Sequence, residues 1–546
     1  PDASYFDICF PPSQGTALND MGAFGGQGAC EWSDDYDGGI TFNINEIDYG
    51  IVITNSSNEY VLNIISLVDQ DKNYYVNIEG DDSESINQFI IDNSVLTVSP
   101  NIDIVLPITY NPSIEGIHVA KLIIQEDSET TGQYFEIDLI GESISGNVIS
   151  GEISGTWTLE NSPYLVVGDL LVNPYNSLTI VPGVEVVFME DYEFRVEGEL
   201  HAVGTEQDSI YFRSDTPGES TWKGISFQFS TDLSEISYAD IQNTSSYAVY
   251  SYYANPITIT HSSFHDCNST VLFFDDTFSQ VTLSYLSIVE SNGSHGGIQG
   301  NSTVLSMDNI MIQGTGGGYG VYYSGNYELF MDNVYVENFE RGLVINSSNN
   351  FANTINNSRF TSNVHGVYLN NGRAVLDNCE IDNNESHGIH AEGNNNTLTI
   401  HNSQIYNSND GIYVIGGNDH LTINTTDIYS NSGRGMYINR AEDSSTSSLY
   451  MDGSTVYDNS GEGIKLYHWN NWATDYSLIS TNIFDNGSHG FDNNYNNTYY
   501  YNPSDIQEFI GCNLWGNGSS GIHSNQNFND TQWTYYNRAS LTNCII

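Results

Sequence analysis

A short motif recurs along the C-terminal two thirds of the chain with a period of about 24 residues. Each copy has an apolar anchor, an asparagine two or three residues later, and a glycine followed by another apolar residue; clear copies are "NSRFTSNVHGVYL", "NSQIYNSNDGIYV" and "GSTVYDNSGEGIKL". The anchors are Ile241, Phe264, Ile288, Ile312, Val336, Phe360, Ile381, Ile405, Ile428, Val456, Ile483, Leu514 and Ile546. Short alternating strands repeated at this period predict a solenoid whose coils stack by parallel pairing.

Asparagine and glycine fill the expected turns between the strands of each coil. These residue types adopt left-handed backbone conformations at little energetic penalty, and stacked asparagine amides can hydrogen-bond from one coil to the next. The asparagines expected to form such a ladder are Asn243, Asn338, Asn363, Asn383, Asn407, Asn431, Asn459, Asn486 and Asn517.

The charge balance restricts the partners of the chain. There are 69 Asp and Glu residues against 12 Lys and Arg, which gives a formal charge of −57. Binding of nucleic acid or of an anionic membrane surface needs clustered cations, so neither partner is expected.

No apolar run approaches the roughly 18 residues of a bilayer span, and the N-terminus has no basic-then-apolar signal peptide. We therefore expect no membrane insertion, and a chain that is a mature form or a fragment.

The residues before and inside the repeat resemble known families. The stretch "LTIVPGVEVVFMEDYEFRVEGELHAVGTEQDSIYFRSDTPGESTWKGISF" (178–227) resembles the opening coils of secreted right-handed parallel β-helix proteins. Residues 40–146 alternate apolar and polar residues between turns, which predicts a β-sandwich. Their "LTVSPN", "ITYNPSIEG" and "IDLIGES" segments resemble choice-of-anchor, Hydin-like immunoglobulin modules of bacterial surface proteins. We expect an all-β fold with an immunoglobulin-like sandwich at 40–146 and a right-handed parallel β-helix at 147–546.

Residues 1–39 are expected to be a cap-like segment and linker. The string "DMGAFGG" within residues 1–32 resembles the tail that closes the last coil in many β-helix proteins, whereas the sequence "LTNCII" aligns with the start of a coil. An uncovered sheet end exposes unpaired backbone groups. One hypothesis is head-to-tail assembly, as filament subunits or as repeats of a longer chain; the alternative is truncation at both ends. The expected contacts join Asp20, Met21, Phe24 and Trp32 of one unit to Cys544, Ile545 and Ile546 of the next.

The residue after each late anchor is expected to face outward, because side chains alternate along a strand. This slot contains the aromatic stripe Tyr406, Tyr429, Tyr457, Phe484 and Trp515. The stripe is interpreted either as a surface that binds sugars or a partner, or as ladder stacking that stiffens the coils. A second outward slot contains Tyr322, Tyr368, Tyr413 and Tyr437.

The residue before each turn glycine is charged or polar. The slot reads Arg341, His365, His387, Asp410, Arg434, Glu462 and His489. We expect a solvated charge ladder in which Asp410, Arg434 and Glu462 pair weakly. His365 and His387 are neighbours in this slot, but two ligands do not complete a metal site.

Cysteine and aspartate positions suggest cross-links and one ion. Cys9 and Cys30 bracket the cap-like segment, and Cys512 and Cys544 each lie two residues before an anchor, so both pairs are disulfide candidates. Cys379 shares the latter slot with Ser358 and Ser403, which indicates a slot for small residues. No cofactor is expected. Structural Ca²⁺ is possible where aspartates cluster, at Asp34, Asp35 and Asp37 or at Asp81 and Asp82, although neither cluster matches a known calcium loop.

Taken together, the sequence predicts a non-enzymatic extracellular or cell-surface structural protein that assembles with itself head to tail and whose aromatic surface is available to glycans. The alternative is a polysaccharide-binding adhesin or a β-helix lyase or hydrolase. Asp275 and Asp276 are adjacent, but the chain has no Arg-x-Lys motif and no recognisable cluster of Arg with several carboxylates.

Overall fold

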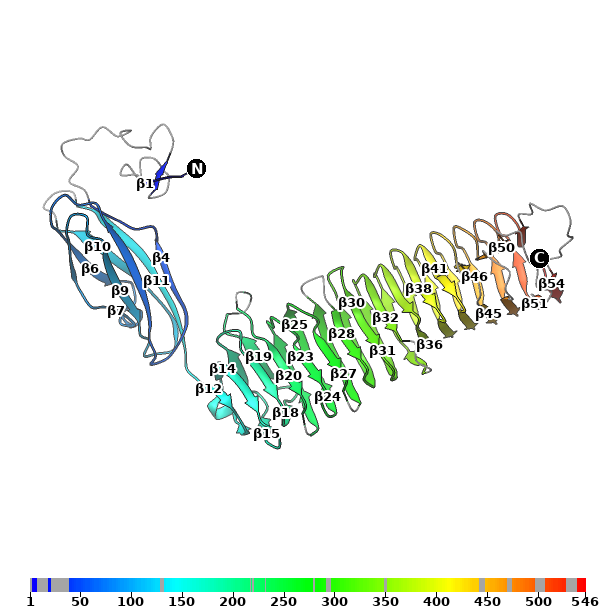
Figure 1. Ribbon diagram of the computed structural model, residues 1–546, viewed down its shortest axis with the longest axis horizontal. Coiled ribbons are helices and arrows are strands. Elements are labelled where there is room, and N and C mark those ends of the chain that lie inside the picture. Colours follow the sequence, from blue (N-terminus) through cyan, green and yellow to red (C-terminus); the bar gives the residue numbers. More distant parts are fainter. Residues whose placement is uncertain are drawn as a thin grey trace. The chain divides into compact units, whose positions relative to one another are not determined.

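The structure is a computed structural model. It describes residues 2–6, 18–20, 39–127, 132–216, 218, 220–230, 232–277, 280–290, 296–347, 351–440, 447–468, 474–495, 506–526 and 538–546. The chain divides into two compact units, Pro1–Gly146 and Asn147–Ile546, and Figure 1 shows strands throughout both. Within the described ranges, no helix has the length and hydropathy that a bilayer span requires.

The first unit contains two facing antiparallel-rich sheets. One has the strand order β4-β11-β10-β6-β8 and the other β3-β5-β9-β7, and only β11 and β4 pair in parallel. Leu62 and Ile108 of one sheet and Leu122 and Ile124 of the other are fully or almost fully buried in one core. The elements are β3 (Ile40–Thr41), β4 (Glu46–Ile53), β5 (Asn58–Ser66), β6 (Lys72–Glu79), α1 (Ser83–Ile86), β7 (Phe89–Ile91), β8 (Val95–Val98), β9 (Ile104–Tyr110), β10 (Gly116–Glu126) and β11 (Tyr134–Ile144), preceded by the hairpin pair β1 (Asp2–Phe6) and β2 (Leu18–Asp20).

The second unit is a parallel solenoid in which each strand pairs with the equivalent strand of the next coil, forming three columns (Figure 1). It opens with β12 (Asn147–Glu152), the 3₁₀ turn Leu159–Asn161 and β14 (Tyr164–Val172), whose two halves start the first and second columns. The long strands β27 (Val281–Glu290), β29 (Leu305–Gln313) and β31 (Leu329–Glu337) continue from the third column into the first.

The first column contains the anchors. Its strands are β16 (Glu185–Phe188), β19 (Ile210–Ser214), β22 (Ala239–Gln242), β25 (Ser263–Cys267), β34 (Arg359–Thr361), β37 (Glu380–Asp382), β40 (Gln404–Tyr406), β43 (Asp427–Tyr429), β46 (Thr455–Tyr457), β49 (Asn482–Phe484) and β52 (Asn513–Trp515).

The second column follows the turn after each anchor. Its strands are β17 (Glu193–Val196), β20 (Gly224–Gln228), β23 (Val249–Tyr252), β26 (Leu272–Asp275), β28 (Gly296–Asn301), β30 (Tyr319–Ser324), β32 (Arg341–Asn346), β35 (His365–Asn370), β38 (His387–Asn394), β41 (Asp410–Gly417), β44 (Met436–Arg440), β47 (Ile464–His468), β50 (Phe491–Tyr495) and β53 (Ile522–Gln526).

The third column closes each coil. Its strands are β13 (Gly155–Trp157), β15 (Ser177–Ile180), β18 (Glu199–Val203), β21 (Ser234–Ser237), β24 (Ile257–Thr260), β33 (Asn353–Asn356), β36 (Arg373–Asp377), β39 (Thr397–His401), β42 (His420–Asn424), β45 (Ser447–Asp452), β48 (Thr474–Ile479), β51 (Ile506–Ile510) and β54 (Arg538–Thr542).

The register follows the sequence repeat. Every anchor from Ile241 to Leu514 pairs with the anchor of the next coil, for example Ile405 with Ile428 and Ile428 with Val456. These side chains are buried inside the coils, because alternation along a strand directs every second residue inward. The predicted all-β fold, with a parallel β-helix after a β-sandwich, is confirmed.

The asparagine ladder is narrower than the sequence analysis predicts. Asn383 and Asn407, two residues after their anchors, have φ near +54° and are exposed. The left-handed residue turns the chain so that the following residue, the third after the anchor, points into the core. The buried positions are therefore Asn363, Asn384, Ser408, Asn431, Asn459 and Asn486, continued by the less buried Asn517. Asn243 and Asn338 also belong to the left-handed column, with φ of 60° and 62°.

Each rung of this buried ladder joins two coils. The backbone N–H and the side-chain amide of Asn431 both donate to Oδ1 of Asn459, at 3.1 and 2.8 Å. Asn459 donates in the same way to Asn486, at 3.2 and 2.9 Å, and its amide also reaches the carbonyls of Ile428 and Tyr457. A buried amide with all of these partners both closes the turn and fixes the register of the next coil.

Replacing Asn459 with Ala should destabilise the β-helix strongly. The substitution leaves the buried donors of Asn431 without their acceptor, and each unsatisfied group costs about 1–3 kcal/mol. We expect the thermal unfolding midpoint to fall clearly and amide hydrogen exchange to accelerate on both neighbouring coils. The matched control is Asn407→Gly, which removes an exposed amide while keeping a residue suited to φ near +54°; an equal loss in both variants would contradict the ladder's role.

Candidate functional site

The predicted aromatic stripe forms one continuous stack on the first column. Neighbouring ring centroids lie 4.8 Å apart for Tyr406–Tyr429, 5.0 Å for Tyr429–Tyr457, 5.0 Å for Tyr457–Phe484 and 4.4 Å for Phe484–Trp515. The interplanar angles are 10° or less. Each inner ring therefore presents both faces to its neighbours, and mainly its edge to solvent.

The second outward slot lies on the second column and is interrupted by a histidine. Tyr368 pairs in register with His390, and His390 pairs with Tyr413. The ring of His390 lies 4.9 Å from that of Tyr368 and 5.1 Å from that of Tyr413. Guanidinium groups cover two rings of the same slot, with Arg341 4.3 Å above Tyr368 and Arg434 3.9 Å above Tyr437.

The charged slot is less solvated than the sequence analysis predicts. Asp410 is 2% exposed, and both of its oxygens accept from Arg434, at 3.1 Å from Nε and 2.9 Å from Nη2. The backbone N–H of Arg434 also donates to this carboxylate at 2.8 Å. Glu462 instead pairs with Lys465 at 2.8 Å. The expected pairing of Asp410 with Arg434 on neighbouring coils is confirmed. Its solvated, weak character is wrong, because the Asp410 carboxylate is buried and accepts from both the guanidinium and the backbone of Arg434, and Glu462 takes no part in the pair.

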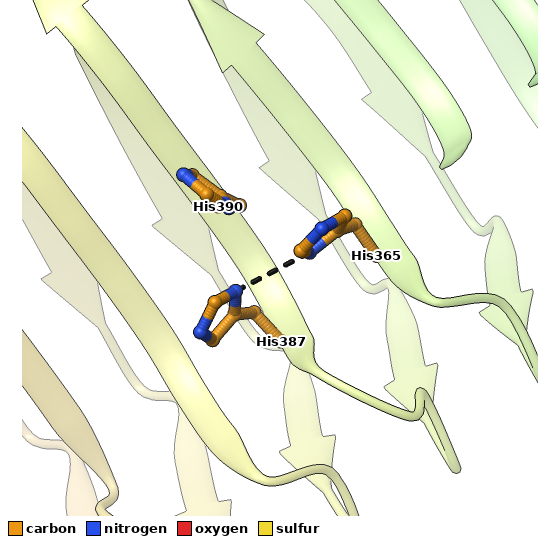
Figure 2. A group of neighbouring side chains, drawn as sticks. All are labelled: His365, His387 and His390. Carbon is orange, nitrogen blue, oxygen red and sulfur yellow. Dashed lines mark hydrogen bonds between the residues drawn. The ribbon is translucent and has the colours of Figure 1, made fainter. Parts of the chain in front are cut away.

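His365 and His387 start β35 and β38, and His390 follows three residues later on β38 (Figure 2). Nδ1 of His365 and Nδ1 of His387 are 3.2 Å apart, and one of them donates to the other. Ring centroids are 5.1 Å apart for His365–His387 and 4.9 Å apart for His390 to each of the other two rings. One nitrogen from each of the three rings lies within 4.8 Å of the other two.

These three imidazoles are held in their neutral form. Burial, with the neighbouring His390 and His365, lowers the pKa of His387 to about 3, and burial lowers the pKa of His390 to about 4. Burial and the Arg341 guanidinium also lower the pKa of His365. Both nitrogens of His390 are shielded from solvent and have no hydrogen-bond partner. The cluster therefore brings one nitrogen of each ring to within 4.8 Å of the other two, and the nitrogens of His390 have no hydrogen-bond partner there.

Sequence analysis identifies His365 and His387 as neighbours but misses His390. His390 could have been found by aligning the second outward slot from coil to coil. In that alignment His390 occupies the position that Tyr368 and Tyr413 occupy in the adjacent coils. The turn glycine separates this slot from the charged slot, so the two appear unrelated along the chain. Parallel stacking brings them together.

A different environment gives His265 the opposite charge state. Its Nε2 lies 3.0 Å from Asp240 on the preceding coil, and its Nδ1 lies 2.7 Å from Asp266. The hydrogen bond to Asp240, aided by Asp266, raises the pKa of His265 to about 9. This imidazolium joins two coils through carboxylates, whereas the His365–His387–His390 cluster has no carboxylate within hydrogen-bonding distance of its facing nitrogens.

The predicted Cys512–Cys544 disulfide is not formed, and both residues are free thiols. Each Sγ contacts the backbone of its own column: Cys512 donates to Leu478 O at 3.2 Å and Cys544 to Phe509 O at 3.3 Å. The slot directs small side chains toward carbonyl groups of the preceding coil, as Cys379 also does toward Ile355 O at 3.4 Å.

For several other residues that the sequence singled out, the structure does not describe the side chain. Cys9, Met21, Phe24, Cys30, Trp32, Asp34, Asp35 and Asp37 fall outside the described ranges, and only the backbone of Asp20 is described, in β2. Ile545 and Ile546 are 67% and 59% exposed, and Cys544 is half-buried.

A family model described as the right-handed β-helix region matches residues 341–505, which include the histidine cluster and most of the aromatic stack. No curated protein sequence matches the chain. The second unit is thus a right-handed parallel β-helix.

Solved structures share parts of the architecture. A PapD-like domain of human CEP192 is 12% identical, with a TM-score of 0.18 over 23% of this chain and 99% of that one. The E. coli chaperone DraB is 11% identical, with a TM-score of 0.16 over 19% of this chain and 55% of the chaperone, so this chain spans about half of its length. A mutant of the periplasmic alginate epimerase AlgG is 14% identical, with a TM-score of 0.28 over 71% of this chain and 84% of that one. At these TM-scores none of the three likenesses bears on what this chain does.

The His265 bridge should make stability fall as the pH rises from about 6.5 to about 9. In that window the folded chain still holds a proton that the unfolded chain has lost, so raising the pH favours unfolding. We expect the wild-type melting midpoint to exceed that of His265→Gln most at pH 6 and least above about pH 9.5. A difference between the two proteins that stays constant with pH would contradict the ion pair.

Proposed function

We propose that this chain is a non-enzymatic structural protein of the cell exterior whose β-helix is a stiff shaft. The observation that carries the proposal is the uninterrupted stack from Tyr406 to Trp515, in which successive rings are parallel and 4.4–5.0 Å apart. Stacked aromatic pairs contribute about 0.5–1.5 kcal/mol each beyond the area they bury. Because each ring touches the rings of both neighbouring coils, the stack resists bending and separation of the coils.

Two further features support a shaft. The buried ladder through Asn431, Asn459 and Asn486 links the same coils along a second line. Carboxylates buried in the coils are paired across coils, as Asp382 is with Arg359 at 2.8 and 2.9 Å and Asp410 is with Arg434. The net charge of −57 favours solubility and opposes lateral aggregation of so much sheet surface.

The alternative is a polysaccharide-binding adhesin or a β-helix polysaccharide lyase or hydrolase. Sugars bind to aromatic residues through the faces of the rings. In this stack the faces of Tyr429, Tyr457 and Phe484 are covered by their neighbours. The geometry therefore favours the stiffening interpretation of the stripe over the glycan-binding one.

Head-to-tail assembly is an extension of this proposal. In it, residues 1–32 of one unit cover the coil that contains Leu541, Ile545 and Ile546 in a neighbouring unit. The proposed contact would bury these three side chains, which are 48%, 67% and 59% exposed. Apolar groups that cluster on a surface favour burial by a partner.

The double variant Tyr429→Ser/Tyr457→Ser should lower the stability of the β-helix. It removes three of the four stacked pairs, so we expect a loss of about 2–4 kcal/mol, measured as a drop in the thermal midpoint. The control is Tyr211→Ser, a 42% exposed tyrosine on β19 outside the stack. Loss of binding to a polysaccharide array without loss of stability would instead favour the adhesin alternative.

Assembly can be tested on the full chain by sedimentation and electron microscopy. We expect end-to-end species that increase with protein concentration and that Ile545→Asp abolishes, because a buried unpaired carboxylate is strongly unfavourable. Met311→Asp, on the exposed side of β29, should assemble normally. Monomers at all concentrations would reject the head-to-tail contact and leave the shaft proposal to the stability test above.

A further inference from the structure

The histidine cluster has a feature that aromatic packing does not explain. His387 stacks on Tyr413 at 4.3 Å, and His390 packs between Tyr368 and Tyr413, so three aromatic rings of any kind would fill the space. A phenylalanine or tyrosine would do so without hiding unpartnered nitrogen atoms. Both nitrogens of His390 are shielded from water and lack a hydrogen-bond partner, and such burial is unfavourable by roughly 1–3 kcal/mol per polar group.

The separation of the nitrogens suits a metal ion. For metal–nitrogen bonds of about 2.05 Å in tetrahedral geometry, the two ligand nitrogens lie about 3.3 Å apart. Nδ1 of His365 and Nδ1 of His387 are 3.2 Å apart. One nitrogen from each of the three rings, including one of His390, lies within 4.8 Å of the other two. Binding of an ion would require one ring to rotate about its side-chain bonds to close the remaining gap.

A carboxylate lies behind one of the candidate ligands. Nε2 of His387 points toward Oδ2 of Asp410 at 4.0 Å, while its Nδ1 faces the cluster. Histidines that bind metals commonly donate their other ring N–H to a carboxylate, which fixes the tautomer and makes the ligating nitrogen more basic. The same Asp410 is held in place by Arg434.

Two guanidinium groups and three carboxylates surround the cluster. Arg341 and Arg434 lie near the rings, but the first is 3.5 Å from Glu340 and the second is paired with Asp410. Glu392 adds a third carboxylate, 3.7 Å from Nε2 of His390. The local sum of two guanidinium groups and three carboxylates is negative.

We propose that His365, His387 and His390 bind one divalent transition-metal ion across two coils of the β-helix. Three imidazole nitrogens select borderline ions such as Zn²⁺, Ni²⁺ or Cu²⁺ over Ca²⁺ and Mg²⁺, which require oxygen ligands. The ion satisfies one of the two buried nitrogens of His390 and cross-links β35 to β38.

The test is zinc titration of the full chain by isothermal calorimetry in excess Mg²⁺, which occupies the many surface carboxylates. We expect one tight zinc ion per chain, and visible absorption typical of tetrahedral Co²⁺ when cobalt replaces zinc. His390→Phe keeps the ring between Tyr368 and Tyr413 but removes both nitrogens, so it should fold normally by circular dichroism. It should weaken zinc binding at least about tenfold and abolish the cobalt spectrum.

His489→Phe is the matched control. His489 occupies the same slot as His387 in a later coil and stacks on His523 at 4.2 Å and 10°, without a third imidazole. This variant should bind zinc like the wild type. Failure of the folded wild type to bind zinc in excess Mg²⁺, or equal binding by the wild type and His390→Phe, would overturn the site.

Discussion

Parallel pairing between equivalent strands of successive coils is the constraint on which the rest of the second unit depends. It sets a spacing of about 4.8 Å between coils and places each residue beside its counterpart one period away. Anchors meet anchors, as Ile405 meets Ile428, and the same rule builds the aromatic stack and the buried amide ladder. Any side chain that recurs in one slot becomes a column, so a small sequence bias is amplified into a long, continuous structural feature.

The same constraint explains which parts of the structure could be predicted. Strand positions follow from alternation and period, so the anchors and the outward position of Tyr406 to Trp515 could be read from the sequence. The inward and outward directions of the side chains in the turn could not be predicted so directly from the sequence. A residue with φ near +54° shifts the inward direction to the next residue, and this places Asn384 and Ser408, rather than Asn383 and Asn407, in the buried ladder. The burial of Asp410 was missed because it accompanies the hydrogen bonds that its carboxylate accepts from Arg434 on the next coil.

A site whose residues come from two different slots of the repeat also could not be predicted from the sequence. The histidine cluster joins the slot before the turn glycine to an outward slot three residues later, and the parallel pairing of β35 with β38 brings His390 against His365 and His387. Local surroundings then decide the chemistry of each histidine. Carboxylates on both sides keep His265 charged, whereas burial among rings keeps His387 neutral.

The buried amide ladder has a direction. Asn431, Asn459 and Asn486 each donate an amide hydrogen to Oδ1 of the asparagine on the following coil, and the amides of Asn459 and Asn486 also reach a carbonyl of the preceding coil. The amide dipoles therefore add along the shaft, and each bond polarises the next. A coil joined before Asn363 would have to offer donors, whereas a coil joined after Asn517 would have to offer acceptors. The two directions of the shaft are chemically distinct, and a coil transplanted in reverse orientation would meet like groups at every rung.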